Sequence, residues 1–207
     1  MARMTSFLLG DISGRIGDKV YYRRNGKTFV RSLTQKKQAQ QTPAQQLQRE
    51  RFTRMLRFCQ KFKYSVIPLI WNDLAKRSSG FNLFMKTNAP AFDAGGEITD
   101  PKLIRLSMGK LYVPFEFTAK RTENNPQRVE VAWLKDMHLG GIYLWDELLA
   151  VSTANEQYSN IISTGITRGM LGGSFELPDQ ETPATHLYFF MASGDKRNFS
   201  DSICFEI

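Results

Sequence analysis

The chain is poor in the residues on which disulfide scaffolds and many metal sites depend. Its 207 residues include two cysteines and two histidines. Cys59 and Cys204 lie far apart, and neither has a second ligand at the short spacing of a zinc site. A disulfide framework is therefore not indicated. Both cysteines fall in apolar patterns, so we expect two buried, unreactive thiols in a reduced protein.

Long apolar runs are missing as well. The apolar run of residues 66–71, for example, is interrupted by Pro68. The apolar residues 7–9 near the N-terminus are too few for the core of a signal peptide. We expect no membrane span and no signal peptide, and we place the protein in the cytoplasm or in a virion.

Recognisable catalytic motifs are also missing. The sequence has no Walker, Rossmann, G-x-S-x-G or H-E-x-x-H pattern. His138 precedes a glycine pair in an expected loop, and His186 begins an expected strand. Asp146 and Glu147 have no partner carboxylate that the sequence brings to them. We therefore expect no enzyme activity, no catalytic residue, no metal site and no cofactor.

Acidic residues are scarce in the first part of the chain. Residues 1–77 hold 17 Lys/Arg and 4 Asp/Glu, a net charge of +13, whereas residues 78–207 hold 11 and 16, a net charge of −5. This split predicts a basic arm that meets an anionic surface and a body with another role. The content of hydrophobic residues, 42%, is enough for a folded core.

A β-hairpin is strongly indicated near the N-terminus. Residues 20–24 and 27–31 read as two strands around Asn25-Gly26, the dipeptide favoured in a type I′ turn. A two-residue loop places Arg24 opposite Lys27 and Tyr22 opposite Phe29. Neither face of this ribbon is purely apolar, and a lone two-stranded ribbon is marginally stable in water. We expect the hairpin to lean on another part of the protein.

Helices are expected between the hairpin and residue 90. Residues 33–41 are polar and read as a linker. Thr42 is the expected N-cap of a helix that starts at Pro43 and runs to about residue 64, with Gln45 completing a capping box. Residues 67–75 and 79–88 read as two further short helices. A boundary is expected across residues 89–100, which contain Pro90 and the glycine pair 95–96.

From residue 102 onward the apolar pattern alternates with a period of two. The expected strands are 102–108, 110–118, 127–134, 142–150, 158–163, 172–177, 186–192 and 200–206. The predicted fold class is α+β, with an N-terminal hairpin and helices in residues 1–90. Residues 101–207 are predicted to form an antiparallel, immunoglobulin-like β-sandwich.

The best candidate site is the basic and aromatic hairpin with the helix that follows. Its cations can neutralise phosphates, and its aromatic residues can stack on bases or pack on protein. Packing of the same aromatics into the protein's own core is the equally weighted alternative. The candidate residues are Arg15, Lys19, Tyr21, Tyr22, Arg23, Arg24, Lys27, Phe29, Arg31, Lys36, Lys37, Arg49, Arg54 and Arg57.

Three stretches of the chain resemble a known family. The first is the opening with Gly10, Ile12, Ser13, Gly14, Arg15, Ile16, Gly17 and Asp18, which leads into Val20-Tyr21-Tyr22 and Gly26-Lys27-Thr28 with Val30 and Arg31. The second is the helix start with Thr42, Pro43, Ala44 and Gln45, followed by Arg49, Arg51 and Phe52. The third is the later Gly80-Phe81-Asn82 with Phe84 and Asn88. Together, over residues 8–90, they are similar to a family of uncharacterised proteins from Bacteroidota and their phages or mobile elements. The resemblance implies an attachment or assembly module in front of a variable β-rich domain, and it carries no catalytic residue.

Three functions remain open from the sequence. The leading hypothesis is a non-enzymatic structural or adaptor protein that docks through its basic arm into a larger homo- or hetero-oligomeric assembly, such as a virion or nucleoprotein particle. The first alternative is nucleic-acid binding by the hairpin and the basic helix. The second is carbohydrate or peptide binding by loops of the sandwich. The expected partners are therefore an anionic protein surface or a nucleic acid.

Overall fold

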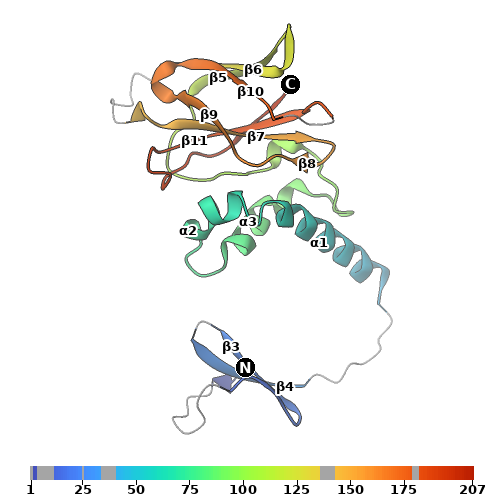
Figure 1. Ribbon diagram of the computed structural model, residues 1–207. Helices are drawn as coiled ribbons and strands as arrows, with labels where there is room; N and C mark the ends of the chain where they lie inside the picture. Colours follow the sequence, from blue (N-terminus) through green and yellow to red (C-terminus); the bar gives the residue numbers. More distant parts are fainter. Residues whose placement is uncertain (1, 4–11, 25, 34–40, 136–142, 179–181) are drawn as a thin grey trace. The chain divides into compact units, whose positions relative to one another are not determined.

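The protein divides into two compact units, Met1–Thr42 and Pro43–Ile207. The computed structural model describes residues 2–3, 12–24, 26–33, 41–135, 143–178 and 182–207 (Figure 1). Lys36, Lys37 and His138, and most of the expected linker, lie outside the described residues.

The first unit is a four-stranded antiparallel sheet in the order β1-β4-β3-β2. Its strands are β1 (Ala2–Arg3), β2 (Gly14–Ile16), β3 (Lys19–Arg24) and β4 (Lys27–Ser32). The expected register is confirmed, because Arg24 pairs with Lys27 and Tyr22 with Phe29. Gly26 has a φ of 70°, which a type I′ turn requires. The hairpin is more than a ribbon, since β2 pairs with β3 and β1 with β4.

The second unit begins with helices. They are α1 (Pro43–Lys61), the π-helix η1 (Ile67–Trp71), α2 (Asn72–Leu74) and α3 (Gly80–Asn88). The expected start at Pro43 is confirmed, whereas α1 ends three residues before the expected position 64. Ser79 caps α3, because its hydroxyl accepts a hydrogen bond from the Asn82 amide at 3.2 Å. A Cβ on Gly80 would lie 2.4 Å from Asn72 Oδ1, so glycine permits this close contact between α3 and α2.

Two antiparallel sheets follow the helices. The three-stranded sheet has the order β10-β6-β5, and the five-stranded sheet has the order β12-β11-β7-β8, with β9 also paired to β7. The strands are β5 (Phe115–Thr122), β6 (Asn125–Leu134), β7 (Glu147–Ala154), β8 (Gln157–Tyr158), β9 (Ile162–Thr167), β10 (Gly172–Glu176), β11 (His186–Ala192) and β12 (Ile203–Glu206). The expected combination of helices with antiparallel sheets is confirmed.

The second unit has three layers, with the five-stranded sheet in the middle (Figure 1). Alternate residues of β7 and β11 point to opposite sides of that sheet. Val151 and Phe190 belong to a core shared with the helices, which also contains Phe58, Phe84 and Trp71. Ala150 and Phe189, which alternate with them along the strands, belong to a second core, shared with the three-stranded sheet.

This layering explains why the division of the chain differs from the one that the sequence predicts. The expected boundary near residues 89–101 falls inside the second unit, and the observed division falls at Thr42. The change from helical to alternating pattern at residue 102 marks a change of secondary structure only. Helices and sheet bury one common core, so the pattern does not mark the end of a domain.

The expected strand at 102–108 was wrong. Residues 101–103 form the 3-10 helix η3 (Pro101–Leu103), and the chain then runs as an extended segment outside both sheets. Side chains of the helices form hydrogen bonds with backbone groups of this segment that a neighbouring strand would otherwise bind. The Asn88 amide accepts from Arg105 N at 2.7 Å and donates to the Arg105 carbonyl oxygen at 3.1 Å. Trp71 Nε1 donates to the Leu106 carbonyl oxygen at 2.8 Å.

Candidate functional site

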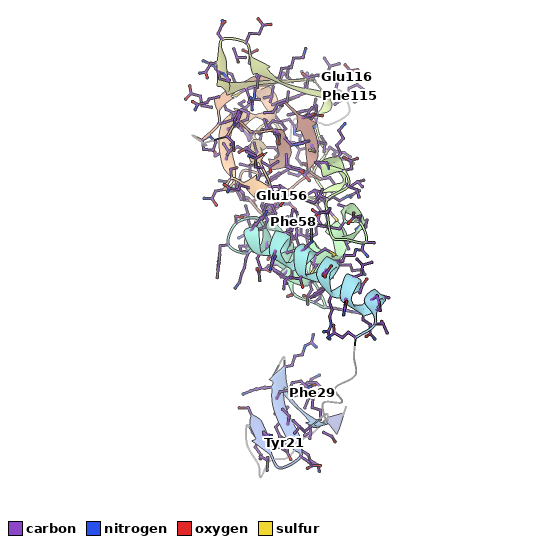
Figure 2. The ribbon with its side chains drawn as sticks, turned by 90° about the vertical axis from the view of Figure 1, so that its right-hand side faces the viewer. Tyr21, Phe29, Phe58, Phe115, Glu116 and Glu156 are labelled. Atoms are coloured by element: carbon purple, nitrogen blue, oxygen red, sulfur yellow. The ribbon has the colours of Figure 1, made fainter. Side chains whose placement is uncertain are left out.

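The two faces of the N-terminal sheet have different chemistry. Cross-strand pairing places on one face, here called the basic face, the residues Arg15, Val20, Tyr22, Arg24, Lys27, Phe29 and Arg31. Arg15, Arg24, Lys27 and Arg31 of this face are all exposed. On the opposite face lie Ile16, Lys19, Tyr21, Arg23, Thr28, Val30 and Ser32. Figure 2 labels one residue of each face, Phe29 and Tyr21.

An aromatic pair forms the centre of the basic face. The rings of Tyr22 and Phe29 are stacked, with centroids 5.6 Å apart and an angle of 21° between their planes. Both side chains are half-buried, so part of each ring is open to solvent. Arg24 and Lys27 flank the pair on the side of the turn, and Arg31 flanks it at the other end. Guanidinium and ammonium groups around a flat apolar platform suit a ligand with both phosphates and rings.

The N-terminal sheet lacks a core of its own. None of the residues that the structure describes between 12 and 33 is fully buried. The charge is equally one-sided, because residues 1–42 hold 9 Lys/Arg and 2 Asp/Glu, a net charge of +7 out of the +8 of the chain. A sheet this small, with this little buried surface, is weakly stable by itself. The unit therefore presents a charged and incompletely buried surface to any partner.

The basic residues predicted on the helix belong to the second unit. Arg49 is exposed near the start of α1. Arg54 forms an ion pair with Glu97, and Arg57 lines a hollow of about 330 Å³ together with Lys61, Glu97 and Glu156. Figure 2 labels two residues that line this hollow, Phe58 and Glu156. Arg54 thus has an acidic partner in its own unit, and Arg57 lines the same hollow.

Cationic side chains in and near the hollow bind groups of the protein itself. Lys61 Nζ donates to the Glu156 carbonyl oxygen and lies 5.5 Å from the centre of the Tyr158 ring. Arg51, one of the residues that carry the family resemblance, donates from Nη2 to the carbonyl oxygens of Ala89 and Phe92, both at 3.1 Å. Nine of the predicted residues lie on the N-terminal sheet, which is the part of the candidate site that the structure describes best. The roles of Arg49, Arg54 and Arg57 on α1 stay predictions.

The cysteines are poor candidates for nucleophiles. Burial raises the pKa of the Cys59 thiol from 9.0 to about 12. Burial is also the main reason why the pKa of the Cys204 thiol rises to about 11, although Cys204 is only partly buried. Both thiols are thus protonated at neutral pH, which opposes nucleophilic chemistry.

His186 is half-buried and its Nδ1 lies 3.1 Å from the Thr185 hydroxyl.

Sequence reasoning missed a second surface, at one end of the two antiparallel sheets of the second unit. Strands expected at 110–118 and 142–150 would have placed Tyr112, Leu144 and Trp145 inside the sheets. The observed strands β5 and β7 begin later, at Phe115 and Glu147, so these residues stand outside the strands. All three are exposed, Trp145 to 80%. The period-two pattern predicts that a strand exists, but it locates the ends of the strand poorly.

Comparisons of the chain with family models, with curated proteins and with solved structures found no match. The resemblance of residues 8–90 to proteins of Bacteroidota therefore stays a prediction. Within the described residues, no helix is both long enough and apolar enough to cross a membrane. The same residues contain no group of three or more His, Cys, Asp or Glu side chains arranged to hold a metal ion.

Proposed function

We propose that the protein is a non-enzymatic structural or adaptor protein, and that its N-terminal sheet docks it onto an anionic surface of a larger assembly. The observation that carries the proposal is the N-terminal sheet itself. The unit that contains it, residues 1–42, holds +7 of the net charge of +8 of the chain, and none of the described residues between 12 and 33 is fully buried. A partner that covers the sheet would supply the burial and the counter-charge that the sheet lacks.

The separation of the two faces supports this role. On the basic face, four exposed cations surround the stacked pair Tyr22 and Phe29. Among the described residues, the opposite face carries two cations, Lys19 and Arg23, beside Tyr21 and Val30. One face is thus suited to an anionic surface, and the other to a mixed apolar and polar contact. The second unit, with its two buried cores, would be the body that the sheet attaches.

Nucleic-acid binding is the second candidate, and the aromatic pair is the observation that favours it. Lys and Arg neutralise phosphates, and aromatic rings stack on exposed bases with little sequence preference. An acidic protein surface needs the cations but gives no particular use to a stacked pair among them. Binding of a carbohydrate or peptide by loops of the β-sheets stays a prediction. The immunoglobulin-like topology of the sheets also stays a prediction.

Charge reversal on each face tests the proposal. Arg24→Glu with Lys27→Glu changes the basic face by four charge units, and Lys19→Glu with Arg23→Glu makes the same change on the opposite face. We expect the first pair to reduce binding to single-stranded DNA, or to a polyglutamate surface, far more than the second. Binding is measured by fluorescence anisotropy over a range of salt concentrations, and circular dichroism confirms that the second unit remains folded.

The salt dependence distinguishes the two candidates. Displacement of counterions from a nucleic acid makes the logarithm of affinity fall by about 0.7 for each phosphate contact per decade of salt on single strands. We expect the Arg24→Glu and Lys27→Glu pair to lower that slope if the partner is a nucleic acid. Equal losses from both pairs of substitutions would show that net charge alone matters, and full binding by both variants would exclude the sheet as the docking element.

A further inference from the structure

Seven exposed apolar side chains gather at one end of the sandwich. They form what we call the apolar end, made of Tyr112, Phe115, Leu134, Leu144, Trp145, Met170 and Leu171. These residues come from four separate segments of the chain. Figure 2 shows Phe115 beside Glu116 at this end, away from Phe58 and the helices.

Hydrogen bonds connect the four segments, so the cluster is a feature of the fold. Phe115 pairs with Leu134 across β5 and β6. Trp133 N donates to the Leu171 carbonyl oxygen at 3.1 Å, and Gly169 N donates to the Leu144 carbonyl oxygen at 3.0 Å. The fourth link comes from a buried side chain, since Arg168 Nη2 donates to the Tyr112 carbonyl oxygen at 2.6 Å.

A buried ion pair anchors the apolar end from inside. Arg168 Nε lies 3.3 Å from Asp146 Oδ2, and both side chains are less than 10% exposed. Asp146 directly follows the exposed Trp145, and Arg168 begins the 3-10 helix η5 (Arg168–Met170). The Arg168 carbonyl oxygen accepts a hydrogen bond from Trp133 Nε1 at 3.1 Å. The pair therefore fixes two of the segments that present the apolar residues, which keeps the surface preorganised.

The area of this surface is large for a monomer. Aromatic side chains present roughly 150–250 Å² each, so the exposed parts of Tyr112, Phe115 and Trp145 come to about 400 Å². With the four aliphatic residues, the apolar end exceeds the roughly 300–600 Å² of the largest apolar patch on a typical monomer. It approaches the roughly 800 Å² that each partner contributes to an interface of standard size.

Charges at the border of the apolar end favour a second copy of the chain as the occupant. Glu116 follows Phe115, and Lys135 follows Leu134, at the neighbouring ends of two paired strands, and both are exposed. Across a two-fold axis, Glu116 of one copy can lie opposite Lys135 of the other copy, and Lys135 of the first opposite Glu116 of the second. One acidic and one basic group on the same border therefore form two ion pairs. Residues 43–207 hold 19 Lys/Arg and 18 Asp/Glu, so the two bodies repel each other little.

We infer that the apolar end pairs two copies of this chain across a two-fold axis, with Trp145 near the centre and Glu116 opposite Lys135 of the second copy. The inference is independent of the function proposed for the N-terminal sheet. The dimer joins two bodies, and the two basic sheets are thereby attached to one particle. Two attached sheets bind a shared anionic surface more tightly than one does.

The oligomeric state in solution tests this inference. Sedimentation velocity of the full chain over a serial dilution should show a monomer that converts to a dimer as the concentration rises. We expect Trp145→Glu to raise the dimer dissociation constant about 30-fold or more, because it buries a charge in the centre of the interface. Tyr64→Glu is the matched control, since Tyr64 is an equally accessible aromatic residue, 86% exposed, on the helical side of the unit. Circular dichroism checks that each variant is folded.

A charge exchange identifies the partner as a second copy. Glu116→Lys and Lys135→Glu should each weaken the dimer when studied alone. A mixture of the two variants should restore dimers, because each contact then joins opposite charges again. The Arg24→Glu and Lys27→Glu variant should dimerise like the unmodified chain, which separates this test from that of the docking sheet. A chain that stays monomeric at every concentration, an unchanged dimer in Trp145→Glu, or a mixture that fails to restore dimers would each overturn the inference.

Discussion

Burial decides the protonation of Cys59 and the hydrogen bonding of Asn88. Cys59 lies in the core between helices and sheet, where burial raises the pKa of its thiol to about 12. Asn88 is buried as well, and both ends of its amide bind the backbone of Arg105. Their roles follow from the apolar surroundings, which suppress ionisation in the first and require complete hydrogen bonding in the second.

The thiols provide a pH-dependent prediction at this scale. A pKa raised above 9.0 lowers the thiolate fraction at pH 8 tenfold per unit, which is about 1,000-fold for Cys59 and about 100-fold for Cys204. We expect Cys59 to react with a thiol reagent more slowly than Cys204, and both to react faster as the pH rises toward their pKa. The rates are measured on the single variants Cys204→Ser and Cys59→Ser. Denaturation in guanidinium is the control and should equalise them, whereas rapid labelling of folded Cys59 would contradict its burial.

At the scale of elements, the turn between β3 and β4 fixes the register of the N-terminal sheet. Gly26 has a positive φ, and a Cβ added there would meet no atom within 4 Å. Any effect of a larger residue must therefore arise from the backbone conformation and not from a clash. A left-handed conformation is unfavourable for a residue with a side chain by about 1–2 kcal/mol, and a β-branched residue suits it least.

We accordingly expect Gly26→Val to weaken the pairing of β3 with β4. Amide hydrogen exchange should become faster in residues 19–31 and remain unchanged in β7 and β11, which belong to the second unit. Gly194→Val is the matched control, because position 194 is equally open and does not have a positive φ. Equal protection of residues 19–31 in both variants would mean that the turn does not hold this register.

The elements that could be predicted from sequence are those with strong local signals. Asn25-Gly26 gave the hairpin register, and Thr42-Pro43 gave the start of α1. The strand β2 was missed because three residues containing a glycine carry little signal. Helical spacing of apolar residues does not show where the core ends, since Leu47 and Phe52 in the first half of α1 are exposed. The apolar end was missed because its residues come from four distant segments, which only the tertiary fold brings together.

At the scale of the whole molecule, the helices and the five-stranded sheet depend on each other. Residues of both faces of β7 and β11 are buried, and one of these faces is covered by α1, η1 and α3. Removal of the helices would expose Val151, Tyr188 and Phe190 to water. The sheet would then carry a broad apolar face, which favours aggregation over a stable fold.

This dependence predicts how fragments behave. We expect residues 43–207 to unfold cooperatively on heating, with the near-ultraviolet circular dichroism of the full chain. Residues 101–207 alone should lose that signal or aggregate, because the core with the helices is missing. Limited proteolysis of the full chain should accordingly remove the first unit and spare the segment 89–101. Cooperative melting of residues 101–207 would instead show that the sandwich is an independent domain.

The absence of fully buried residues among those described in the N-terminal sheet has a thermodynamic consequence. If a partner completes the core of this sheet, then folding and docking are one equilibrium, and neither can be measured without the other. At a partner concentration 100-fold above its dissociation constant, the bound form gains about 2.7 kcal/mol over the free form. Substitutions that weaken the sheet would then reduce affinity even where they touch no partner. A survey of affinity across the sheet would therefore report its folding as well as its contacts.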